Sequence, residues 1–86
     1  MNRSGATKYL ASCRAGERLI VGGVEGGAER VDRLASIGIL PGVELRVQQT
    51  RPVVVVDLDG TVLALDREIA GCVQAARVQE PSSGKK

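Results

Sequence analysis

Apolar residues alternate with polar ones, or gather in short runs, along most of residues 17–78, and this pattern predicts a mainly β domain. The run ERLIVGGV, residues 17–24, predicts a first strand. In VELRVQ, residues 43–48, every second side chain is apolar, which indicates a strand with one face in water. The run VVVVDLDGTVL, residues 53–63, predicts two strands joined by a tight turn, and VQAARV, residues 73–78, predicts a short closing strand.

One segment, residues 28–37, has the periodicity of an amphipathic helix. The apolar residues on one of its faces are Val31, Leu34 and Ala35. Gly38 can adopt the left-handed conformation that ends a helix in a Schellman motif, and Ile39 can then fold back onto Leu34. The next four residues, 40–43, fit a type II turn, because proline fixes φ at its second position and glycine accepts a positive φ at its third.

Two shorter elements complete the prediction. A helical turn is expected over residues 9–14, with Tyr9 and Leu10 packed inward, and a second one over residues 67–72. Residues 1–8 and 80–86 are polar and contain glycine, serine or proline, so both ends are expected to be disordered. One domain is therefore expected over residues 9–79.

The stretch Asp-Leu-Asp-Gly-Thr, residues 57–61, is also the pattern by which haloacid dehalogenase-type phosphatases present a nucleophilic aspartate. Such an enzyme needs further carboxylates for Mg²⁺ and a lysine for the phosphoryl charge, and the residues after Gly60 contain no lysine before Lys85. Asp59-Gly60 is instead a preferred pair for a two-residue type I′ hairpin turn. We therefore expect no catalytic residue and no enzymatic activity.

The composition narrows the function further. The 86 residues carry a formal net charge of +2, and the basic residues are scattered, which does not indicate binding of nucleic acid. The chain has no histidine, and Cys13 and Cys72 lie far apart, so neither a metal site nor a cofactor is expected. No segment has the length and hydrophobicity needed to cross a bilayer, and a cytoplasmic location is expected.

The residues Arg33-Leu34, Ile37-Gly38-Ile39 and Pro41-Gly42 together form a string of the type RL…LG(L/I)xPG. This string is the most specific feature by which the chain, over roughly residues 15–78, resembles the ferrous iron transport protein A (FeoA) family. The family's closing strand is matched by Ala64-Leu65, Arg67 and Ala70. The resemblance implies a small SH3-like five-stranded barrel with a helix inserted after the first strand.

The resemblance also implies a function. Family members are small cytoplasmic accessory proteins of bacterial ferrous iron uptake, so the implied partner is a membrane-embedded ferrous iron permease with a cytosolic GTPase domain. Binding to it would place the protein at the periphery of the inner membrane. The alternatives are a generic SH3-like protein-interaction module or a regulator-type domain unrelated to iron, and weak self-association through an exposed edge strand also stays open.

The candidate partner-binding residues are Arg33, Ile39, Leu40, Pro41, Gly42 and Arg51. Within the loop 39–43, Leu40 is expected to be exposed beside a rigid turn, with Arg33 and Arg51 as charges at the rim. The alternative that Leu40 belongs to the core stays open. The connection QQTRP, residues 48–52, is shorter than in many relatives, which matters because it could form part of a partner surface.

Overall fold

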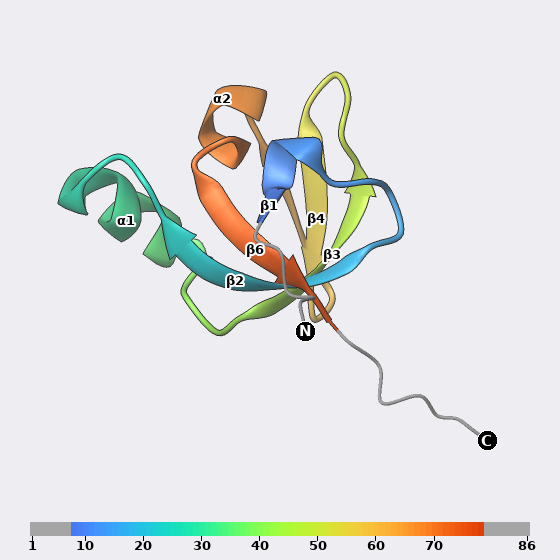
Figure 1. Cartoon of the computed structure of the whole chain (residues 1–86), viewed down its shortest axis with the longest axis horizontal. Helices are drawn as coiled ribbons and strands as arrows, with labels where there is room; N and C mark the ends of the chain where they lie inside the picture. The colour runs from blue at the N-terminus through green and yellow to red at the C-terminus, as the bar shows by residue number, and fades with distance from the viewer. Residues whose placement is uncertain (1–7, 79–86) are drawn as a thin grey trace, which may run out of the picture.

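The computed structural model describes residues 8–78, so residues 1–7 and 79–86, which contain nearly all of the predicted disordered ends, lie outside the described residues. Six antiparallel strands form one sheet in the order β1-β6-β2-β3-β4-β5 (Figure 1). The strands are β1 (Lys8–Tyr9), β2 (Arg18–Val24), β3 (Glu44–Gln49), β4 (Val54–Leu58), β5 (Thr61–Leu65) and β6 (Val73–Arg77). The helices are η1 (Leu10–Ser12), α1 (Ala28–Ala35) and α2 (Arg67–Ala70).

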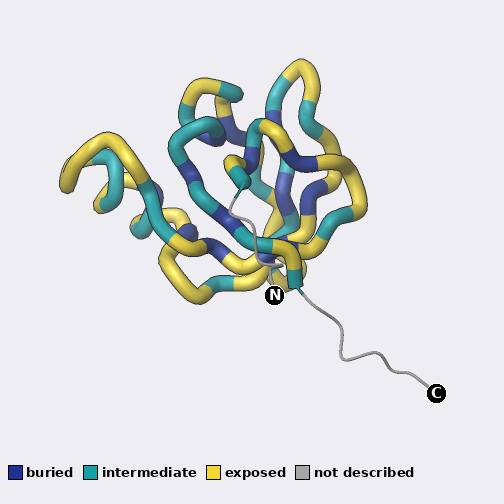
Figure 2. Tube along the Cα trace, viewed as in Figure 1, coloured by how far each residue is buried: buried dark blue, intermediate teal, exposed yellow. Residues whose placement is uncertain are grey.

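The sheet curls around a core of aliphatic side chains, and the buried positions line its inner side (Figure 2). Buried and exposed residues alternate along β2 and β3, as expected for strands with one wet face. The core consists of Leu10, Cys13, Leu19, Val21, Leu34, Ile39, Leu45, Val47, Val54, Val56, Leu65, Ala70, Val73 and Ala75. The prediction of a small, mainly β SH3-like domain is confirmed. The described residues form six strands where five were predicted, because the two-residue strand β1 precedes the strand that leads into the helix.

The hairpin β4–β5 has the register that follows from the predicted two-residue turn at Asp59-Gly60, with Val56 opposite Leu63 and residue 54 opposite residue 65. Asp59 and Gly60 have φ angles of 54° and 96°, as a type I′ turn requires at both central positions. The Asp57 carboxylate accepts the backbone N–H of Gly60 at 2.7 Å. Both aspartates of the phosphatase-like motif therefore serve the turn.

The beginning of the described chain differs from the prediction. Lys8 and Tyr9 form strand β1, which pairs with β6, and Leu10 begins a 3₁₀ turn. Leu10 is fully buried as expected, but the prediction that Tyr9 packs inward is wrong, because 37% of Tyr9 is exposed. Successive side chains of an extended chain point to opposite sides, so Tyr9 and Leu10 could not both point inward.

Candidate partner-binding surface

The C-terminus of α1 is held by the predicted Schellman motif. Gly38 has a φ of 100°, and the backbone N–H of Ile39 donates to the carbonyl of Leu34 at 2.9 Å. A second bond joins the N–H of Gly38 to the carbonyl of Ala35 at 3.0 Å. Because the cap begins this early, α1 ends at Ala35 and residues 36–38 form a turn.

The predicted type II turn follows and is tied to the sheet. The N–H of Val43 donates to the carbonyl of Leu40 at 3.1 Å, and Gly42 has a φ of 93°. Gly42 also donates its N–H to the carbonyl of Val21 at 2.8 Å, and Val21 donates its own N–H to the carbonyl of Val43 at 2.9 Å. The turn is therefore fixed to β2 as well as closed upon itself.

Two large apolar side chains near this turn lie at the surface, since Leu40 is 43% exposed and Ile37 is 42% exposed. Leu40 is thus not a core residue. Ile39, by contrast, is only 1% exposed because the residue after the capping glycine folds back onto the helix. The side chain of Ile39 therefore belongs to the core and is removed from the candidate contact, whereas Ile37 is added to it.

The two candidate rim charges lie in different places. Arg33 is exposed on the last turn of α1, one residue before the buried Leu34. Arg51 follows the far end of β3, whose six residues span about 20 Å. The structure therefore keeps Arg33 at the helix end that carries the cap and separates Arg51 from the turn at residues 40–43.

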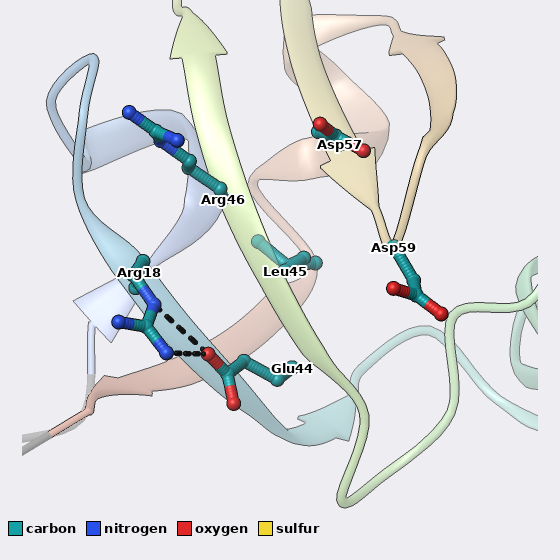
Figure 3. A pocket seen from close by; sticks show the side chains of 6 residues that line it. All are labelled: Arg18, Glu44, Leu45, Arg46, Asp57 and Asp59. Carbon is teal, nitrogen blue, oxygen red and sulfur yellow. Dashed lines mark hydrogen bonds and ion pairs between the residues drawn. The ribbon is translucent and has the colours of Figure 1, made fainter.

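A shallow pocket of about 520 Å³ lies on the outer face of the sheet (Figure 3). Its lining residues are Arg18, Glu44, Leu45, Arg46, Asp57 and Asp59. Arg18 forms an ion pair with Glu44, with 2.6 Å between Nη2 and Oε2, and Arg46 stands opposite Asp57 in the β3–β4 register. The lining contains charged side chains of both signs, so this face selects neither an anion nor a cation.

Among residues 8–78, no three or more His, Cys, Asp or Glu side chains are grouped so that they could hold a metal ion. Cys13 is buried and Cys72 is half-buried, and both are free thiols. Arg30 donates to the sulfur of Cys72, with 3.0 Å between Nη1 and Sγ. Within the same part of the chain, no helix has both the length and the hydrophobicity needed to span a membrane.

The side chains whose pKa values are shifted lie around strand β1, away from the turn at residues 40–43. The pKa of Glu17 is lowered because its carboxylate accepts the backbone N–H of Arg14 at 2.8 Å and pairs with Lys8 at 3.2 Å. The pKa of Tyr9 is raised because its hydroxyl donates to the Glu25 carboxylate at 2.6 Å, which stabilises the neutral phenol. These contacts fasten the segment before β2 to the sheet.

The strand order, the core and the capped helix define a small SH3-like domain that presents a rigid turn. A family model described as "FeoA domain" matches residues 8–77. The chain belongs to this family. The predicted resemblance is confirmed.

Solved structures show the same fold. A crystal structure of an iron uptake regulatory protein (FeoA) matches with a TM-score of 0.78 and 24% identity, covering 85% of this chain and all of the other. The FeoA protein from Chlorobium tepidum matches with a TM-score of 0.74 and 24% identity, over 84% of this chain and 71% of that one.

A manganese-dependent transcriptional repressor also matches, with a TM-score of 0.78 and 22% identity over 88% of this chain. The match covers only 44% of the repressor, so the likeness concerns one part of a longer protein. No curated protein sequence matches the chain.

Proposed function

We propose that this protein is an accessory module of ferrous iron uptake that binds the ferrous iron permease or its cytosolic GTPase domain. Membership of the FeoA domain family supports a role in ferrous iron transport. The observation that carries the binding proposal is the exposure of Ile37 and Leu40 on a backbone fixed by the Schellman motif and the tied turn. Binding of this kind would bring the module to the inner face of the membrane.

A fixed backbone favours such a contact because little conformational freedom remains to be lost on association. Pro41 restricts its own φ, and the N–H groups of Gly38, Ile39, Gly42 and Val43 are all engaged within the domain. Leu40 and Ile37 can then be buried against a partner without reorganising the loop. Arg33, at the end of α1, is the proposed charge at the rim of this contact.

An accessory module regulates its partner only if it binds one conformation of the partner more tightly than another. We therefore expect the affinity for the permease to depend on the nucleotide bound to the GTPase domain. Equal affinity for all nucleotide states would leave a docking role and remove the regulatory one.

The proposal is tested by measuring the Kd of this protein for the purified ferrous iron permease of the same organism in lipid nanodiscs. Leu40→Asp and Ile37→Asp should each weaken binding at least about tenfold, because a carboxylate would be buried without a partner. Ile20→Asp is the matched control, since Ile20 is a similarly exposed apolar residue on the outer face of β2.

Loss of binding in the two turn variants and its retention in the control would support the proposal. Failure of the wild-type protein to bind the permease would overturn it. Equal binding by all three variants would keep the partner and exclude this surface. Competition by the isolated GTPase domain would show which part of the permease is contacted.

A further inference from the structure

Strand β5 lies at the end of the sheet, and within residues 8–78 only β4 pairs with it. In a two-residue hairpin the residues flanking the turn, Leu58 and Thr61, form a hydrogen-bonded pair, so residues 61, 63 and 65 bond to β4. Val62 and Ala64 therefore direct their N–H and C=O groups to the open edge. Four backbone groups on this edge are available for another strand.

This edge strand lacks the features that normally prevent an exposed edge from pairing with another strand. Its sequence is Thr-Val-Leu-Ala-Leu, with no charged residue, proline or glycine, and its ladder with β4 contains no register shift. The ladders of β2 with β6 and of β3 with β4 both contain such a shift. Val62 is 56% exposed, and Leu63, on the core side, is only half-buried. The edge is thus regular, neutral and accessible.

We propose that β5 pairs in antiparallel fashion with β5 of a second copy of this chain, about a two-fold axis at Leu63. In this register Val62 faces Ala64 of the second copy, and Ala64 faces its Val62. Each such pair exchanges two backbone hydrogen bonds, so the N–H and C=O groups of Val62 and Ala64 in each copy are all satisfied. An axis at Val62 or Ala64 would instead pair a strand residue with Gly60 or Asp66, outside β5.

The side chains favour a second copy as the occupant. The strand has no charge, so it meets itself without like-charge repulsion, and Val62 is matched by the small Ala64 on the outer face. The two Leu63 residues form a non-hydrogen-bonded pair, whose Cα atoms approach to about 4.5 Å. Leu63 would complete its burial there. Because only five residues pair, the dimer is weak and forms at high protein concentration.

A disulfide cross-link tests the register. Leu63→Cys is made in a Cys72→Ser background, and the protein is oxidised mildly at high concentration. A covalent dimer is expected because the Cα separation at the axis suits a disulfide. Thr61→Cys in the same background is the control, since the two copies of residue 61 would lie about 13 Å apart, beyond the reach of a disulfide.

Sedimentation velocity provides a second readout that needs no change at Leu63. Wild-type protein should show concentration-dependent dimerisation up to about 1 mM, whereas Ala64→Lys, which guards the edge with a charge, should remain monomeric. Ile20→Lys, on the outer face of β2, should dimerise like the wild type. A monomeric wild type, equal cross-linking at positions 61 and 63, or a persistent dimer in Ala64→Lys would each overturn the proposal.

Discussion

The cap-and-turn segment, residues 34–43, and the N-terminal segment, residues 8–17, each place two buried side chains in the same core: Leu34 and Ile39 in the first, and Leu10 and Cys13 in the second. Ile39 is positioned by the Schellman motif, whose backbone bonds join residues at most five positions apart, and the turn that follows it is also tied to Val21 of β2. The position of Leu10 depends on β1, which pairs with a strand more than sixty residues later.

The polar contacts of the N-terminal segment join residues both near and far in sequence. Lys8 pairs with Ala75 through the backbone and with Glu17 through its ammonium group. Glu17 also lies 3.4 Å from Arg77, and Tyr9 donates to Glu25. The comparison shows that a segment can be well packed in the core although its pairing with the sheet, between β1 and β6, joins residues far apart in sequence and gives no local signal.

The largest expected effect comes from Leu10→Ala. If the N-terminal segment is an integral part of the core, this change should lower the free energy of unfolding by about 2–5 kcal/mol, as removal of a fully buried leucine does elsewhere. Leu34→Ala, at the cap-and-turn segment, should cause a loss of the same size. Urea denaturation followed by circular dichroism measures both.

The control for this pair is Ile20→Ala, whose side chain is 40% exposed, and it should change the free energy of unfolding by less than about 0.5 kcal/mol. An effect of Leu10→Ala as small as that of the control would mean that the N-terminal segment is only loosely attached. The two segments would then differ in how much they contribute to the free energy of unfolding, and not only in the sequence separation of the contacts that hold them.

A smaller effect is expected from Gly38→Ala, which adds only a Cβ to the residue that caps the helix. Gly38 has a φ of 100°, and a side chain in the left-handed region costs about 1–2 kcal/mol. A Cβ at this position would lie 3.7 Å from Cδ2 of Leu58, which is ordinary contact, so the loss is attributed to the backbone. The urea midpoint should fall accordingly.

Gly22→Ala is the matched change, because Gly22 is an exposed strand residue at which a Cβ would also meet its nearest atom, the Gln74 carbonyl oxygen, at 3.7 Å. It should be close to neutral. Equal losses at the two glycines would argue that contacts, and not the left-handed backbone, determine the cost.

The parts of the fold that sequence reasoning predicts correctly are those with a local physical cause. The Asp59-Gly60 turn fixes the register of the whole β4–β5 hairpin, and Gly38 fixes the end of α1. Strand β1 has no such cause, since two residues show no periodicity, and its existence depends on the edge offered by β6. The inward orientation predicted for Tyr9 failed for the same reason.

The residues of the candidate partner-binding surface divide in the same way, into those that a local sequence signal identifies and those that it does not. Leu40 could be proposed from its place beside a proline–glycine turn, and its exposure agrees with that proposal. Ile37 was missed because its spacing from Leu34 suggests the buried face, and only the early end of the helix turns it outward. Arg51 is near Leu40 in sequence, but a complete strand separates them.

The smallest expected effect concerns the hydrogen bond between Tyr9 and Glu25 in the N-terminal segment, which can be observed directly by titration. The chain has a single tyrosine, so the ultraviolet absorbance of its phenolate reports Tyr9 alone. The Glu25 carboxylate accepts a hydrogen bond from the phenol hydroxyl, so the pKa of Tyr9 should lie above its ordinary value of about 10.

Glu25→Gln should bring that pKa down towards the ordinary value, while the urea midpoint at neutral pH should hardly change because the contact is exposed. The stabilising contribution of a raised tyrosine pKa is complete below the unfolded pKa and is lost as the pH rises through the folded one. Glu29→Gln, on α1, is the control and should leave the titration unaltered. Identical titration curves for the wild type and Glu25→Gln would show that Tyr9 and Glu25 are apart in solution, and the long-range docking of the segment would then depend on Leu10 and the β1–β6 pairing alone.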